Sequence, residues 1–280
     1  MPSHPAIAPG RAAVITGGAS GIGFAAALKL AGLGMKLCIA DLPGDALDRA
    51  HAELAAVSPG ALAVGVDVGK LADVERLKQA AYAAFGEVAL LMNNAGTAPG
   101  GGPYDHMDRW RRVIEVNLFG VIHGVQIFTP AMLAQRTPCA IVNTGSKQGI
   151  TCPPGDTAYN VSKAGLKVLT EGLAHALRNE PGNHVSAHLL VPGSTFTGMT
   201  AQGASEKPAS QWSAAQVVDF MLDGMAAGDF YILCPDNEVT RETDNKRIRW
   251  AAEDLIHNRP ALSRWHPDHA DAFKDYVARG

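Results

Sequence analysis

The chain of 280 residues is 47% hydrophobic and carries a formal net charge of −3. This length and apolar content are enough for one large hydrophobic core. The weak negative charge gives no basic surface field, so neither nucleic acid nor an anionic membrane is an expected partner. No apolar run approaches the roughly 20 residues of a membrane span, and residues 1–5 lack the apolar core of a signal peptide. We therefore expect a cytoplasmic protein.

Apolar strand patterns alternate with helical patterns along most of the chain. This alternation is typical of a parallel sheet that is covered by helices on both faces. We therefore predict an α/β fold, a Rossmann-type doubly wound parallel sheet in a single domain over residues 1–280. Strands are expected at 12–15, 36–40, 62–66, 88–92, 140–144, 185–190 and 230–233, and helices at 24–33, 45–57, 71–85, 108–133, 157–179 and 214–226.

A glycine-rich turn at residues 16–23 joins the first predicted strand to the first predicted helix. Glycines at such a turn let the backbone approach a pyrophosphate, and the helix N-terminus offers free N–H groups and a positive dipole end. The spacing is GxxxGxG rather than the general GxGxxG. These features predict a dinucleotide-binding turn.

Asp41 ends the second predicted strand, 20 residues after Gly21. A carboxylate at this place can accept hydrogen bonds from the ribose hydroxyls of the adenosine half of a dinucleotide. It would also repel a ribose 2′-phosphate, and neither Leu42 nor the glycine turn offers a positive charge. NAD is therefore the expected cofactor, and NADP is disfavoured.

Tyr159 and Lys163 lie four residues apart, and Ser146 lies 13 residues before the tyrosine. In a helix the i, i+4 spacing places the phenol and the ammonium on one face. A nearby cation favours the phenolate, so Lys163 is expected to lower the pKa of Tyr159. Such a pair is common on helices, but together with a dinucleotide turn it indicates an acid/base centre that acts on a hydroxyl.

With these motifs the chain resembles the short-chain dehydrogenases/reductases of the compact, single-domain type, over roughly residues 10–235. One departure is Gly145, where many relatives carry a second serine. Seven elements in the family's order support the resemblance: the TGxxxGxG turn at 16–23, the acid after a strand in Asp67 and Val68, the NNAG segment at 93–96, the helix residue Asn117, the serine Ser146, the YxxxK pair of Tyr159 and Lys163, and the turn at Pro192 and Gly193 followed by Thr197.

The resemblance implies an oxidoreductase that moves hydride between NAD and a secondary alcohol or ketone. Tyr159 would be the general acid/base, Ser146 would bind the substrate oxygen, and Lys163 would bind the nicotinamide ribose. Asn117 would bind a water through its backbone and link Lys163 to solvent as a proton relay. The implied cofactor contacts are Gly17, Ser20, Gly21, Ile22, Gly23, Asp41, Asp67, Val68, Asn94, Ala95, Gly96, Tyr159, Lys163, Val191, Pro192, Gly193 and Thr197.

We expect the substrate pocket between the loops at 97–103 and 147–156 and a lid at 193–212. Its predicted contacts are Ser146, Gln148 and Tyr159, together with Phe196 and Trp212, which suggest an apolar or aromatic substrate. Lys147 either adds a polar contact for the substrate or points to solvent. The residues define the substrate only as a small-molecule secondary alcohol or ketone.

Residues 236–280 form a C-terminal helical extension that the minimal fold does not need, and the pattern from 238 to 256 predicts a charged amphipathic helix. Three positions are open for it: against a neighbouring subunit, at the pocket mouth, or as a cap on its own chain. His266, Asp268 and His269 are spaced too loosely for a metal site, so no metal is expected. The resemblance implies a homotetramer, formed through the helices that carry Asn117 and Tyr159.

Two other functions are open. A dinucleotide-binding sensor without turnover could use the same fold, but it would have no physical need for Ser146, Tyr159 and Lys163 together. The second is an NADPH-dependent carbonyl reductase, against which Asp41 argues.

Overall fold

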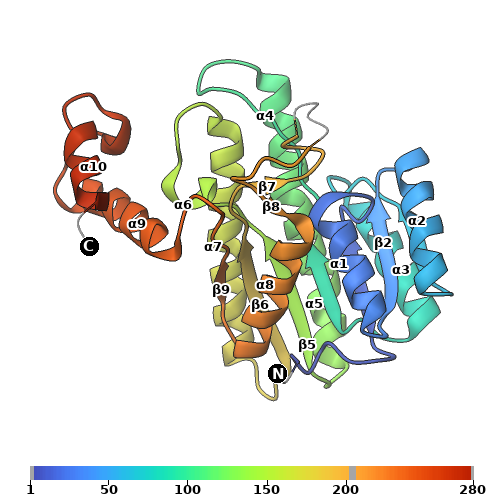
Figure 1. The fold of residues 1–280 in the computed structure, drawn as a ribbon. Coiled ribbons are helices and arrows are strands. Elements are labelled where there is room, and N and C mark those ends of the chain that lie inside the picture. The colour runs from blue at the N-terminus through green and yellow to red at the C-terminus, as the bar shows by residue number, and fades with distance from the viewer. Residues whose placement is uncertain (1–2, 202–205, 279–280) are drawn as a thin grey trace.

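Seven strands form one parallel sheet in the spatial order β3-β2-β1-β4-β5-β6-β9 (Figure 1). The computed structural model describes residues 3–201 and 206–278. The chain builds outward from β1 in both directions, so the topological switch point lies between β1 and β4, where such folds bind ligands. The strands are β1 (Ala12–Thr16), β2 (Lys36–Asp41), β3 (Leu62–Gly65), β4 (Leu90–Asn93), β5 (Cys139–Thr144), β6 (Val185–Val191) and β9 (Tyr231–Leu233).

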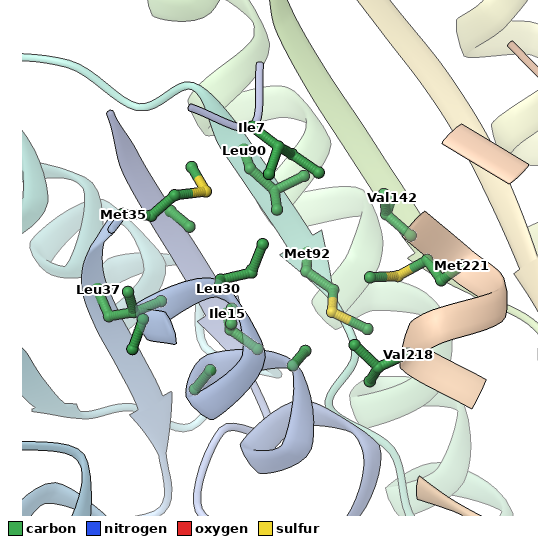
Figure 2. Packing of buried hydrophobic residues seen from close by; sticks show 14 of the residues in the cluster. Ile7, Ile15, Leu30, Met35, Leu37, Leu90, Met92, Val142, Val218 and Met221 are labelled. Carbon is green, nitrogen blue, oxygen red and sulfur yellow. The ribbon is translucent and has the colours of Figure 1, made fainter. Parts of the chain in front are cut away.

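Helices cover both faces of the sheet because the side chains of each strand alternate between the faces. In β1, Ile15 packs with α1, α2 and α8, whereas Val14 packs with α3, α5 and α7. Figure 2 shows the first of these two apolar clusters, with Leu30 of α1 and Met221 of α8 on the two sides of Met92. The predicted doubly wound fold is thus confirmed. The covering helices are α1 (Gly21–Gly32), α2 (Asp45–Val57), α3 (Leu71–Phe85), α5 (Gly120–Ala134), α7 (Thr157–Asn179) and α8 (Ala214–Ala227).

The helix predicted at 108–133 is present, but it is interrupted by a π-helical turn. α4 (Met107–Ile114) continues through the turn Glu115–Phe119 into α5. Contrary to our expectation, this continuous stretch is long and apolar enough to cross a membrane by length and composition alone. Val121, Phe128 and other apolar residues of α5 lie in the second apolar cluster, against the sheet. The apolar composition is therefore explained by packing in the core.

The predicted lid begins and ends in a short two-stranded ladder. β7 (Thr195–Phe196) pairs in parallel with β8 (Trp212–Ser213), and the N–H of Trp212 donates to the carbonyl of Ser194 over 2.9 Å. Residues 202–205 of the predicted lid lie outside the described residues, as do residues 1–2 and 279–280 of the predicted domain. The ladder fixes where the lid segment leaves the body and where it returns.

The C-terminal extension forms an arm, which we define as residues 236–278. Its helices are α9 (Arg241–Ile256) and α10 (Ala270–Ala278). At one side of the molecule α9 lies beside α6 (Gln148–Thr151), and α10 packs on α9 farther out (Figure 1). α9 starts later than predicted because Thr240 caps it, accepting a hydrogen bond from the N–H of Thr243. Trp250 packs edge-on against Phe273, with ring centroids 5.4 Å apart. The arm therefore has a small core of its own.

The N-terminal segment lies at the opposite end of the sheet from the carboxyl ends of the strands. His4 Nε2 lies 3.2 Å from Ser186 Oγ, close to the beginning of β6. The rings of His4 and His188 meet edge to face, with centroids 5.5 Å apart. This segment is therefore fixed far from the cavity described next.

Candidate active site

A cavity of about 910 Å³ opens at the carboxyl ends of the central strands. Three of the predicted site residues, Gly23, Asn117 and Val191, are buried and do not form part of its wall. The cavity brings together seventeen others: Gly17, Ser20, Gly21, Ile22, Asp41, Asp67, Val68, Asn94, Ala95, Gly96, Ser146, Gln148, Tyr159, Lys163, Pro192, Gly193 and Thr197.

The glycine turn is shaped by close contact with the segment that follows β4. Gly17 has a φ of +64°, and a Cβ atom there would lie 2.7 Å from the Cα of Ala95. The side-chain amide of Asn94 donates to the carbonyls of Thr16 and Gly17, each over 3.2 Å. Gly23 lies beneath the turn, where a Cβ atom would come within 2.2 Å of the carbonyl oxygen of Gly17. Larger residues at these positions would push the turn out of shape.

Asp41 is fixed at the edge of the glycine turn. Its Oδ2 accepts the backbone N–H of Ala19 over 3.0 Å, and its Oδ1 accepts that of Leu42 over 2.8 Å. The carboxylate is therefore oriented by the turn itself while it lines the cavity. This is the position that a ribose-binding acid requires.

Ser146, Tyr159 and Lys163 meet at one part of the cavity wall. Ser146 follows β5, and its side chain interacts with that of Tyr159 so as to lower the pKa of the phenol. Lys163 is nearly fully buried; its Nζ lies 5.7 Å from the centroid of the Tyr159 ring and donates to the carbonyl of Thr144 over 2.7 Å. The three predicted catalytic side chains are thus brought together by β5 and α7.

The pKa values of these groups are set mainly by burial. Loss of water raises the pKa of Tyr159, the hydrogen bond with Ser146 acts against this, and the charge of Asp156 raises it further. Burial lowers the pKa of Lys163 to about 8. The expected lowering of the Tyr159 pKa by Lys163 is therefore not seen. Desolvation is the main cause of the raised pKa of Tyr159, and the Lys163 ammonium donates to the carbonyl of Thr144.

Asn117 lies in the π-helical turn and connects two other segments. Its Oδ1 accepts the N–H of Thr97 over 2.7 Å, and its Nδ2 donates to the carbonyl of Thr97 over 3.0 Å and to Ser162 Oγ over 3.2 Å. Ser162 Oγ in turn donates to the carbonyl of Tyr159 over 2.7 Å. π-helical turns are frequent at functional sites. Here the turn joins the loop after β4 to the helix that carries Tyr159.

The structure does not bring Phe196 and Trp212 to the cavity wall. Trp212 packs against Phe220 of α8 with ring centroids 5.8 Å apart, since β8 leads directly into that helix and Ser213 caps it. Several other residues of the lid segment line the cavity, and Met199 contributes an apolar side chain. The aromatic contacts that we expected from the lid therefore have no support from its geometry.

Two polar residues of the site, Asp156 and Lys147, have contacts that we did not predict from the sequence. Asp156 caps α7 and accepts the N–H of Tyr159, and an Asp directly before a predicted helix was a signal for that role. Lys147 lines the cavity rather than pointing to solvent, and its Nζ lies 2.6 Å from Asp244 Oδ2 in α9. No local pattern could have indicated this contact, because its partners are far apart in the chain.

Comparison with known proteins gives consistent results. A family model described as short chain dehydrogenase matches residues 11–208. A 1-deoxy-11-beta-hydroxypentalenate dehydrogenase of Streptomyces exfoliatus is 31% identical over 262 residues, which are 91% of this chain and 94% of the relative. A 3beta-hydroxysteroid dehydrogenase 2 of Eggerthella lenta is 32% identical over 69% of this chain and 74% of the relative.

A solved structure gives the same result. The short chain dehydrogenase/reductase from Burkholderia phymatum in complex with NAD is 36% identical and has a TM-score of 0.82, covering 90% of this chain and 96% of its own. The matched family model, the named dehydrogenases and the parallel sheet therefore agree. The chain is an oxidoreductase that acts on hydroxyl or keto groups of small molecules, and it belongs to the short-chain dehydrogenase/reductase family.

Proposed function

We propose that the protein is an NAD-dependent dehydrogenase that interconverts a secondary alcohol and its ketone, with Tyr159 as the acid/base. The observation that carries the proposal is the meeting of Ser146, Tyr159 and Lys163 at one cavity wall, in the same cavity as the glycine turn. A sensor without turnover has no need of these three groups together.

The cavity fits a dinucleotide. The glycine turn offers backbone N–H groups at the start of α1, where a Cβ atom on Gly17 would collide with Ala95. Asp41 would accept the adenosine ribose hydroxyls, which favours NAD over NADP, and Asp67 and Val68 would flank the adenine. When bound, NAD supplies the nicotinamide carbon that takes up or returns hydride. The remaining contacts would come from Ser20, Gly21, Ile22, Asn94, Ala95, Gly96, Lys163, Pro192, Gly193 and Thr197.

The chain's own groups would handle the proton. In the oxidation direction the phenol oxygen of Tyr159 takes the proton of the alcohol, and the hydroxyl of Ser146 donates to the substrate oxygen. Lys163 would bind the nicotinamide ribose, and a water held by the backbone of Asn117 would link Lys163 to solvent as a proton relay. The raised pKa of Tyr159 keeps the phenol protonated near neutral pH. This protonation state suits proton donation to a ketone and requires a higher pH for alcohol oxidation.

The proposed substrate class is a secondary alcohol or ketone on an apolar cyclic skeleton. Two relatives are named for hydroxypentalenate and hydroxysteroid substrates. Near Ser146 and Tyr159 the cavity lining includes the apolar side chain of Met199 and the uncharged polar side chains of Thr97 and Gln148, and the lining also contains the charged Lys147. Met199 would contact the apolar skeleton, while the polar side chains would contact its oxygen substituents.

We also propose a cytoplasmic homotetramer. Phe119 beside Asn117, and Val161 and Val168 on the helix of Tyr159, are 42%, 44% and 66% exposed. Exposed apolar side chains on these two helices support an interface there. Sedimentation of the purified protein tests the assembly, and a monomer would contradict it.

The function is tested by following reduced nicotinamide absorbance. NAD or NADP is mixed with cyclic, aliphatic and aromatic secondary alcohols, and the corresponding ketones are tested in reverse. We expect turnover with NAD and a cyclic alcohol. It should fall by about a thousandfold in Tyr159→Phe and be kept in Tyr104→Phe, whose side chain is exposed. Equal turnover in wild type and Tyr159→Phe would refute the assignment of the acid/base. Tight NAD binding without turnover of any alcohol or ketone would favour the sensor.

A further inference from the structure

The ammonium of Lys147 joins three segments of the chain directly beside Ser146. Its Nζ lies 2.6 Å from Asp244 Oδ2 and 3.5 Å from Asp236 Oδ2. The same oxygen of Asp236 accepts the backbone N–H of Ser194 over 3.2 Å. Three segments therefore meet at the Lys147 ammonium: the loop after β5, the first residues of the lid and the C-terminal arm.

This contact is shielded from water. Asp244 is 3% exposed as a residue, and the side chains of Asp236 and Lys147 are 7% and 18% exposed. A Cβ atom on Gly193 would lie 2.8 Å from Asp236 Oδ2 and 3.1 Å from Lys147 Nζ, so the first residue of the lid segment is packed directly on the ion cluster. Removing one partner of such a pair leaves the other charge buried and uncompensated.

Lys147 in turn determines the local structure around Ser146. Its carbonyl accepts the N–H groups of Ile150 and Thr151 over 3.0 and 3.1 Å, which starts α6. The next residue, Gln148, lines the cavity and donates its N–H to Ser146 Oγ over 3.2 Å. The place where the ammonium is held therefore affects the turn that orients the serine hydroxyl.

The arm meets the body through the first half of α9. Ile248 packs against the second apolar cluster, and Arg241 Nη1 donates to the carbonyl of Leu233 over 3.4 Å. From Trp250 onward the helix packs within the arm. Asp244 lies between Arg241 and Ile248, in the half of the helix that meets the body.

We propose that Asp244 is a positioning residue for the substrate side of the site. By holding Lys147, it fixes both the segment from Ser146 to Gln148 and the first residues of the lid, and so makes the C-terminal arm part of the substrate-binding machinery. The inference rests on the proposed function in one respect, the role of Ser146 in binding the substrate oxygen.

The test uses the full chain and four variants. Asp244→Asn and Lys147→Met each break the ion pair, the double variant removes both partners, and Glu242→Gln removes an exposed acid from the same helical turn as a control. Hydrogen exchange is measured for residues 148–151 and 194–197, with residues 16–23 as the internal reference. KM and kcat are measured with the alcohol found by the absorbance screen.

In both single variants we expect exchange in the two segments to rise about tenfold, with the reference unchanged. KM should rise about tenfold with kcat within about twofold, and the double variant should be no worse than Lys147→Met, because both lack the contact between Lys147 and Asp244. The control should behave as wild type. Wild-type exchange in both segments, a fall in kcat with unchanged KM, or additive effects would each overturn the proposal.

The exchange measurement needs no substrate. If no alcohol is turned over, the proposed function fails, while faster exchange in 148–151 and 194–197 would still support the positioning role. If turnover is normal and exchange is unchanged in Asp244→Asn and Lys147→Met, the positioning role fails and the proposed function stands.

Discussion

The carboxylate of Asp156 accepts the backbone N–H of Tyr159 over 3.1 Å at the start of α7. The same carboxylate accepts the N–H groups of Gly100 and Gly101 over 2.9 and 3.0 Å. Its negative charge also contributes to the raised pKa of Tyr159. One side chain therefore connects a loop of the expected substrate pocket to the proposed acid/base.

Asp156→Asn removes this charge and one of the loop contacts. The pKa of Tyr159 should fall, because a contribution that raises it is lost, so the acidic limb of kcat/KM for alcohol oxidation should move to lower pH. The maximum value of kcat/KM should fall about tenfold, because the loop at Gly100 and Gly101 would be misplaced. The control is Asp105→Asn, an exposed residue that accepts the N–H of Gly102. A limb that stays in place or moves to higher pH would contradict the prediction.

Asp41→Ser tests cofactor selection. The carboxylate is fixed by the N–H groups of Ala19 and Leu42, and its removal eliminates the repulsion of a 2′-phosphate. The ratio of kcat/KM with NADP to that with NAD should rise at least tenfold, equivalent to about 1.4 kcal/mol. Asp45→Asn at the start of α2 serves as the control. An unchanged ratio in Asp41→Ser would remove Asp41 from the cofactor site.

Lys163→Met tests how far the burial of the Lys163 ammonium lowers the free energy of unfolding. The pKa of Lys163 is lowered from 10.5 to about 8, so between these values the unfolded chain binds a proton that the folded chain has released. Stability therefore rises with pH across this window, and the variant lacks that rise. The free energy of unfolding of wild type minus variant should increase by about 3 kcal/mol from pH 7 to pH 10.5.

Urea unfolding at several pH values measures this difference. Lys167→Met, one turn further along α7, removes a partly exposed ammonium and is the matched control. A wild-type minus variant difference that stays flat or falls with pH would refute the prediction. Turnover in Lys163→Met should be lost at every pH, since the proposed mechanism uses the ammonium.

Gly124→Ala tests the close packing of α5 against a row of hydrogen-bonded side chains, Asn93, Asn143 and Thr170. A Cβ atom there would lie 2.1 Å from Asn93 Oδ1. Asn93 donates to Asn143, which donates to Thr170 over 3.0 Å. The clash should destabilise the fold by about 3 kcal/mol in urea unfolding. Gly172→Ala on α7 meets no atom within 4 Å and should instead stabilise it by about 0.5 to 1 kcal/mol.

The parts of this protein that could be predicted from the sequence are those in which a local rule determines the residue type. The glycine turn was recognisable because contacts such as that between Gly17 and Ala95 leave no room for a side chain. The strand–helix alternation was recognisable because Val14 and Ile15 must face different helical layers.

Contacts between distant segments were not predictable. Nothing near Lys147 in the sequence indicates Asp244, and nothing near Asn117 shows that its side chain would bind Thr97. Trp212 failed for a different reason. The sequence around an aromatic residue in a loop does not show whether its side chain faces a cavity or a helix. Here Ser213 caps α8, and Trp212 packs against that helix.

The two ends of the described chain differ in their relation to the cavity. His4 is fixed by Ser186 at the amino end of β6, whereas α10 belongs to the arm that Asp244 connects to the site (Figure 1). A purification tag, a surface-attachment linker or a fused second enzyme at the N-terminus would therefore leave the cavity entrance untouched. The same addition after α10 would be attached to the arm, which contacts the site through Asp244. Engineered forms of this enzyme should therefore be extended at the beginning of the chain.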